Sequence, residues 1–81
     1  MAVRVLFFAT YADLLGRAET ELTLGAPTTV AGLLDLLRQD LPGADRLPAR
    51  PMVAVNQHHA GLETPVVDRD EVAFLPPLAG G

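Results

Sequence analysis

The fold class of this chain is set by residues 30–41, which read VAGLLDLLRQDL. Apolar side chains recur there every three or four positions, as they do along one face of an amphipathic α-helix. These positions are Val30, Leu33, Leu34, Leu37 and Leu41. Thr28 or Thr29 can supply the N-cap, and Leu41-Pro42-Gly43 ends the helix. The sequence therefore predicts one main helix with a single apolar face to bury.

Strand-like segments lie on both sides of this helix. They are rich in β-branched and aromatic residues or alternate polar with apolar side chains. The segments are residues 3–9, 19–24, 52–56, 62–67 and 71–75, of which residues 62–67 contain a proline and are expected to form only a short strand. A right-handed crossover through the helix would place later strands beside the first. The order predicts an α+β fold, with a mixed sheet of four to five strands packed on one main helix.

The remaining segments are expected to be turns and connections. Residues 11–16 fit a short helical turn ended by glycine, and residues 56–59 and 68–70 are polar enough for turns. Residues 44–51 contain two prolines and no usable period, which predicts a surface connection. A chain of 81 residues closes one core, so we expect a single domain over residues 1–81 with a flexible tail at 76–81.

Composition narrows the chemistry that this chain can perform. It has no cysteine, which excludes disulfides, thiolate metal sites and a cysteine nucleophile, and all six basic residues are arginine. Ten acidic residues and a net charge of −4 disfavour binding to nucleic acid and favour a positively charged protein partner. The apolar start is too short to span a bilayer and has no leader-like pattern. We expect no membrane association and a cytoplasmic location.

Two groups of side chains suggest metal sites but do not fit one well. His58 and His59 are neighbours in a predicted turn, and adjacent histidines rarely converge on one ion. Asp68, Asp70 and Glu71 match no calcium loop, and a polar turn explains them equally well. The glycines form no phosphate-binding loop. The sequence predicts no metal and no tightly bound cofactor.

The first and last strands predict an unusual outer surface. If Val5 and Phe7 point to the core, Leu6 and Phe8 face outward, and the same alternation places Leu75 outward on the last strand. With Ala73 nearby, these side chains would form an exposed apolar patch. The patch is either a docking surface for a partner or is covered by a crossing loop.

The last eight residues, 74–81, read FLPPLAGG. Pro76 and Pro77 stiffen the exit from the last strand because each fixes its own φ. Gly80 and Gly81 carry no side chains, so this end could enter a narrow channel and present an unshielded carboxyl carbon. The pattern favours chemistry at the Gly81 carboxylate; an inert frayed end is the alternative.

Three segments together closely resemble the small subunit of molybdopterin synthase. They are residues 5–9, VLFFA, residues 53–56, VAVN, and residues 70–81, DEVAFLPPLAGG. The resemblance spans nearly the whole chain, and its terminal stretch is the most specific part. It implies the ubiquitin-like β-grasp fold, which agrees with the order of elements predicted from the residues.

The resemblance also implies a function at the end of the chain. The Gly81 carboxylate would be adenylated with ATP by an adenylyltransferase related to ubiquitin-activating enzymes, and a persulfide sulfur donor would convert it to a thiocarboxylate. Leu78, Ala79 and Gly80 would then enter the large catalytic subunit within a heterotetramer. There the sulfur would build the dithiolene of molybdopterin, so the chain would not be catalytic alone.

For the partner surface, the resemblance points to Phe8, His59 and Leu75, with Pro76 and Pro77 at the root of the tail. In the family this face docks both the activating enzyme and the large subunit. His59 stands where leucine is typical of the pattern, and Leu75 replaces a frequent phenylalanine.

Three other functions remain open from the sequence. The first is a sulfur carrier for thiamine thiazole synthesis or tRNA thiolation, although Phe74-Leu75-Pro76-Pro77 favours the molybdopterin branch. The second is a ubiquitin-like modifier whose Gly81 becomes attached to lysines of target proteins. The third is a plain interaction domain with an inert tail.

Overall fold

The computed structural model describes residues 1–77 of this chain. The sequence predictions for Leu78, Ala79, Gly80 and Gly81 therefore lie outside the described residues. The elements are, in chain order, β1 (Ala2–Phe7), α1 (Thr10–Leu15), β2 (Glu19–Thr23), β3 (Thr28–Thr29), α2 (Val30–Asp40), the 3-10 turn η1 (Ala44–Arg46), β4 (Met52–Val55), β5 (His58–Ala60), β6 (Pro65–Val66) and β7 (Glu71–Leu75).

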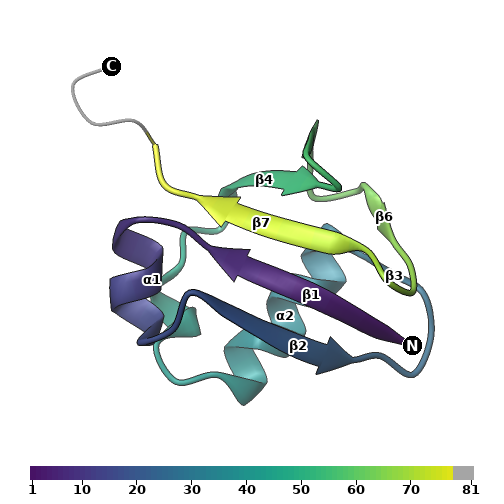
Figure 1. The fold of residues 1–81 in the computed structure, drawn as a ribbon, viewed down its shortest axis with the longest axis horizontal. Coiled ribbons are helices and arrows are strands. Elements are labelled where there is room, and N and C mark those ends of the chain that lie inside the picture. The colour runs from purple at the N-terminus through teal and green to yellow at the C-terminus, as the bar shows by residue number, and fades with distance from the viewer. Residues whose placement is uncertain (78–81) are drawn as a thin grey trace.

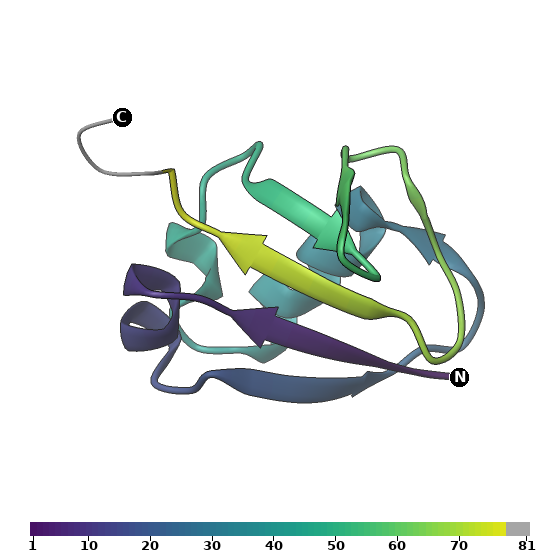
Figure 2. The ribbon, with the colours of Figure 1, turned by 45° about the horizontal axis from the view of Figure 1, so that its top comes forward.

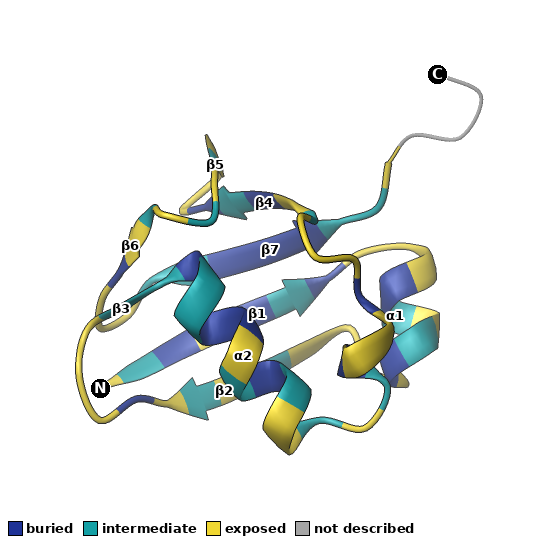
Figure 3. Cartoon of the chain, turned by 180° about the vertical axis from the view of Figure 1, so that it is seen from behind, coloured by how far each residue is buried: buried dark blue, intermediate teal, exposed yellow. Residues whose placement is uncertain are grey.

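The main sheet is mixed, and α2 packs against one of its faces. Its strand order is β2-β1-β7-β4-β5, in which β1 and β7 run parallel and every other neighbouring pair is antiparallel. Figure 3 shows α2 in front of the sheet, whereas Figure 1 looks onto the opposite face, which no helix covers. β3 and β6 form a separate two-stranded sheet. This confirms the predicted α+β fold, and the arrangement is a β-grasp.

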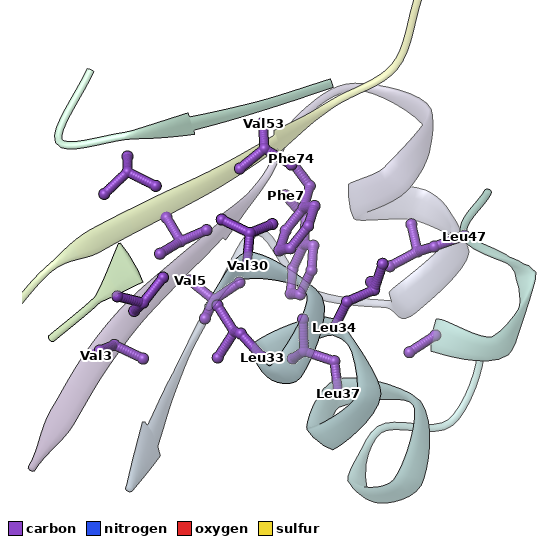
Figure 4. Packing of buried hydrophobic residues seen from close by; sticks show 14 of the residues in the cluster. Val3, Val5, Phe7, Val30, Leu33, Leu34, Leu37, Leu47, Val53 and Phe74 are labelled. Carbon is purple, nitrogen blue, oxygen red and sulfur yellow. The ribbon is translucent and has the colours of Figure 1, made fainter. Parts of the chain in front are cut away.

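The core lies between the sheet and α2, as the apolar stripe of the helix predicts (Figure 4). Most of the large buried side chains of the core come from α2 and from alternate positions of the main-sheet strands, among them Val3, Val5, Phe7, Val30, Leu33, Leu34, Leu37, Val53, Val72 and Phe74. The rings of Phe7 and Phe74 stack with centroids 6.1 Å apart and planes inclined by 17°. Because side chains alternate along a strand, this inward set fixes which side chains face outward.

The ends of α2 agree with the predicted signals. The Thr29 hydroxyl accepts a hydrogen bond from the Gly32 backbone N–H at 3.2 Å, which is the N-cap interaction. The Leu41 N–H donates to the Leu37 carbonyl at 2.8 Å, and Pro42 follows. Neither α-helix of residues 1–77 combines the length and apolar character that crossing a membrane requires.

β1 ends two residues earlier than the sequence predicts. Ala9 has φ 51°, a left-handed value that a strand residue does not adopt. A tight turn begins there, in which the Tyr11 N–H donates to the Phe8 carbonyl at 3.0 Å. The strand therefore stops at Phe7, and Phe8 follows it directly.

The predicted turn at residues 56–59 is wrong in its second half. Only Asn56 and Gln57 form the turn, with φ values of 51° and 70°, and His58–Ala60 is the edge strand β5. A two-residue hairpin turn of type I′ needs positive φ at both central positions, and asparagine tolerates this conformation better than most residues. The predicted strand within residues 62–67 shortens to Pro65–Val66.

The prediction that residues 44–51 form a surface connection is wrong at two positions, although most of the segment is exposed. Ala44 and Leu47 are buried in the core cluster, and η1 brings them there. The Arg38 guanidinium donates to the carbonyl oxygens of Leu47 and Pro48 at 3.2 and 3.0 Å. A single 3-10 turn has no repeated apolar period, so the sequence pattern does not reveal this packing.

Alanine substitutions at three glycines are expected to lower the free energy of unfolding by three different amounts. Gly43 has φ 90°, and a Cβ there would lie 2.8 Å from the Leu14 carbonyl oxygen. We expect Gly43→Ala to lower the free energy of unfolding by about 2 kcal/mol, since it combines left-handed strain with a backbone clash. Gly16 has φ 70° but open space around it, so Gly16→Ala should cost only about 1 kcal/mol.

Gly25 is the matched control for both substitutions. It has no positive φ, and a Cβ there would meet nothing within 4 Å. We expect Gly25→Ala to change the free energy of unfolding by less than about 0.5 kcal/mol. Urea unfolding monitored by circular dichroism measures all three. Equal stability of the Gly43 and Gly25 variants would contradict the close packing of this loop against α1.

Candidate docking face and the root of the tail

Strand register decides which side chains share the uncovered face of the sheet. Leu6 on β1 is in register with Ala73 on β7, Ala73 with Ala54 on β4, and Ala54 with His59 on β5. In the next row toward the tail, Leu75 is in register with Met52, and Phe8 follows the end of β1. We call these residues the outer patch: Leu6, Phe8, Met52, Ala54, His59, Ala73 and Leu75.

Two large apolar side chains of the outer patch are well exposed. Phe8 is 45% and Met52 is 43% accessible, whereas Leu6 and Leu75 are half-buried. Ala73 faces outward but is only 8% accessible, because its methyl group lies between the neighbouring strands. No helix covers this face (Figures 1 and 2). The predicted outward direction of Leu6 and Phe8 is confirmed.

Three of the five residues that the resemblance assigned to partner binding share the uncovered face of the sheet. Phe8, His59 and Leu75 lie on one face although they come from β5, β7 and the residue after β1. Their role in binding stays a prediction. Met52 was missed, although the inward positions of Val53 and Val55 already imply that Met52 faces outward.

A shallow hollow of about 410 Å³ opens beside Phe8. Its lining is mostly apolar and comes from β1, the turn after it, α1 and the start of β2: Arg4, Leu6, Phe7, Phe8, Ala9, Ala12, Ala18 and Glu19. The strained turn at Ala9 forms part of its wall. The hollow has room for an apolar side chain from a protein partner.

Charged side chains occupy the half of this face away from the tail. Arg4 is in register with Glu21 on β2 and Glu71 on β7. Its guanidinium hydrogen-bonds Glu19 at 2.7 Å and lies 3.9 Å from Glu71. The hydrogen bond that Arg4 donates to Glu19, followed by the negative charge of Glu19, raises the pKa of Arg4 above its ordinary value. Because Glu19 is in register with Leu6 and also lines the hollow beside Phe8, this charged cluster borders the apolar part of the face.

The tail begins at the central strand of the sheet. β7 is paired with β1 on one side and β4 on the other, and the Phe8 N–H donates to the Phe74 carbonyl at 3.2 Å. Pro76 is half-buried and Pro77 is exposed. The chain therefore leaves a firmly held strand directly beside the outer patch (Figure 2).

The acidic residues near β7 are engaged in structural hydrogen bonds. The Asp70 carboxylate accepts from Asn56 Nδ2 at 2.9 Å and from the Val67 N–H at 2.8 Å. Asp68 accepts from the Ala2 N–H at 2.8 Å. Within residues 1–77 no three histidine, aspartate or glutamate side chains gather as a metal site would require. The Asp68 contact ties the turn before β7 to the start of β1, and the Asp70 contact with Asn56 ties it to the β4–β5 turn.

The fold and this face define a class of protein before any relative is considered. A mixed sheet packed on one helix, with an uncovered apolar patch beside the end of its last strand, describes a ubiquitin-like β-grasp domain. Comparison with known proteins then gives the family: residues 5–81 match the ThiS family, and the chain belongs to it.

Curated relatives agree with this assignment over nearly the full chain. The chain is 38% identical to the molybdopterin synthase sulfur carrier subunit of Escherichia coli, covering 98% of this chain and 99% of that protein. It is 42% identical to the molybdopterin synthase sulfur carrier subunit of Mycobacterium tuberculosis, covering 98% of this chain and 96% of that protein.

Solved structures show the same fold. SAMP1 from Haloferax volcanii superposes with a TM-score of 0.86 at 25% identity and 100% coverage of both chains. A chain from the complex of subunits 1 and 2 of molybdopterin-converting factor from Helicobacter pylori superposes with a TM-score of 0.71 at 26% identity, again covering 100% of both chains. The ubiquitin-like β-grasp expected from the sequence is confirmed.

Proposed function

We propose that this chain is the sulfur carrier subunit of a molybdopterin synthase. The observation that carries the proposal is its similarity, over nearly the full length of both chains, to curated sulfur carrier subunits of that enzyme. The outer patch and the tail root give this function a physical basis, because they place an apolar docking surface next to the segment that leads to Gly81.

The chemistry begins at the Gly81 carboxylate. A terminal carboxylate has a reference pKa of about 3.5 and is ionised at neutral pH, so its carbon resists nucleophilic attack. Attack of this carboxylate on the α-phosphate of ATP gives an acyl-adenylate and releases pyrophosphate. A persulfide sulfur then displaces AMP, and reductive cleavage of the sulfur–sulfur bond by a thiol leaves the thiocarboxylate. The activating enzyme supplies the nucleotide site.

The outer patch would bind two partners in turn. One is an adenylating enzyme of the ubiquitin-activating type, and the other is the large catalytic subunit, whose pocket receives Leu78, Ala79, Gly80 and Gly81. The Helicobacter pylori neighbour comes from a complex of two subunits of molybdopterin-converting factor, which supports a subunit partner. Phe8, Met52 and Leu75 supply the large apolar contacts, and His59 marks the β5 edge. The carrier would act in the cytoplasm and would turn over no substrate alone.

Intact-mass analysis of the protein isolated from its native host tests this proposal. We expect a fraction of molecules in which one oxygen is replaced by sulfur, localised by fragmentation to Gly81. An unmodified carboxylate in every molecule from sulfur-replete cells making the cofactor would contradict the proposal. Deleting the gene for the large subunit should raise the thiocarboxylate fraction, because sulfur is no longer consumed.

A protein modifier is the second candidate function. The similarity to SAMP1 of Haloferax volcanii favours this function. Another solved structure from the same organism carries the name small archaeal modifier protein 1. In that function the Gly81 carbonyl would form an amide with lysines of target proteins. The same mass measurement separates the two, because a modifier appears as a ladder of covalent adducts.

A further inference from the structure

The sequence contains no lysine, although it has six arginines and ten acidic residues. An acyl-adenylate reacts with amines as well as with sulfur, so any amine near the activated Gly81 would compete with the sulfur donor. With no lysine in these residues, a free amine on Met1 would be an intramolecular competitor. Its position relative to the tail is set by the topology of the sheet.

The parallel pairing of β1 and β7 places that amine far from the tail. The two strands run the same way, with Phe7 in register with Phe74, so Met1 lies at the opposite end of the sheet from Leu75 (Figure 1). Six residues of β1 cover about 20 Å. The residues beyond Pro77 can extend at most about 14 Å. An activated Gly81 cannot reach the amine of its own molecule.

We infer that the lysine-free sequence and the parallel β1–β7 pairing together protect the activated carboxyl group from intramolecular acylation, which reserves it for a sulfur nucleophile. This inference rests on the proposed function. The avoided reaction is the attack of a neutral amine nitrogen on the Gly81 carbonyl carbon. A carbon–nitrogen bond would form, AMP would leave with the electron pair of its carbon–oxygen bond, and the amine proton would pass to water.

Replacing an arginine by lysine introduces an amine into this chain and keeps the positive charge. Met52 pairs with Leu75 in antiparallel fashion, so the exposed Arg50 lies at the end of the sheet where the tail begins. Arg17 lies at the same end, because the Phe7 N–H donates to the carbonyl of Ala18. Arg69 lies at the far end, where its N–H donates to the Ala2 carbonyl at 2.7 Å.

The test compares Arg50→Lys, Arg17→Lys and Arg69→Lys with the natural chain. Each protein is incubated with the activating enzyme of the same host and ATP, without a sulfur donor. ATP–pyrophosphate exchange measures adenylation, and intact mass with peptide mapping detects loss of one water through an internal amide. We expect the Arg50 and Arg17 variants to cyclise, and Arg69→Lys and the natural chain to remain linear.

The pH dependence identifies the chemistry. Lysine has a reference pKa of about 10.4, so its neutral fraction, and the rate of cyclisation, should rise about tenfold per pH unit near neutrality. If Arg50→Lys and Arg17→Lys both stay linear although ATP–pyrophosphate exchange is normal, the inference is overturned and the proposed function is not. If Arg69→Lys cyclises as readily as the Arg50 and Arg17 variants, the distance set by the parallel β1–β7 pairing does not protect the carboxyl group. If the natural chain supports no exchange, the proposed function is wrong and the inference falls with it.

Discussion

Adding one alanine after Gly81 is expected to abolish sulfur transfer while leaving the fold intact. The extension moves the reacting carboxylate one residue further out and places a methyl group on its α-carbon, in a channel suited to glycine. Removing a reacting group in this way typically costs a thousandfold or more in rate, roughly 4 kcal/mol of transition-state stabilisation. Thiocarboxylate formation and synthase activity, both reconstituted with the two partners, provide the measurement.

The control for this extension is an alanine substitution at an exposed position outside the outer patch, such as Glu63→Ala. Both variants should show the circular dichroism spectrum and thermal unfolding of the natural chain, since the added residue lies beyond every residue of the core cluster. Retained sulfur transfer by the extended chain would contradict chemistry at Gly81. Loss of activity in the Glu63 variant would show that the assay reports a general defect.

Phe8→Asp is expected to weaken docking of the large catalytic subunit at least a hundredfold. Phe8 is 45% accessible in the free chain, so the substitution should change stability little. In a complex, however, the new carboxylate would be buried without a partner, which costs about 3 kcal/mol or more. Isothermal titration calorimetry with the large subunit measures the change in affinity.

Ala26→Asp adds the same charge in the exposed loop before β3, away from the outer patch. We expect it to bind the large subunit with the affinity of the natural chain. Unchanged affinity for Phe8→Asp would mean that the outer patch is not the docking surface. A similar loss in both variants would instead point to long-range repulsion, which salt should relieve.

The long, periodic segments of this fold could be predicted from sequence. The spacing of Val30, Leu33, Leu34 and Leu37 predicted α2, and the alternation along β1, β4 and β7 predicted which side chains enter the core. These patterns are reliable because burial of a continuous apolar face dominates the energetics of such elements. They also place Phe8 and Leu75 outward without any knowledge of relatives.

The short elements could not be predicted for a related reason. β3 and β6 contain two residues each and β5 contains three, which is too few for a period. Their pairing is decided by tertiary contacts, such as the register of Thr28 with Val66. The burial of Leu47 likewise depends on one turn that the sequence does not mark.

The candidate site was predicted only in part from the residues themselves. Alternation predicted the apolar face, but His59 was assigned to it through resemblance, because the residues alone suggested a turn there. The structure accounts for that position: the tight Asn56-Gln57 turn folds β5 back so that His59 pairs with Ala54. Met52 completes the face and could have been inferred from its buried neighbours.

The central position of β7 gives the chain a mechanical property. A partner that grips the tail and pulls would apply force along β7, which is held by β1 on one side and β4 on the other. Force in that direction loads the hydrogen bonds of both ladders at once in shear, whereas an edge strand such as β5 could be peeled away one bond at a time. The sheet is therefore expected to resist a pull on the tail better than it would if the tail left from an edge strand.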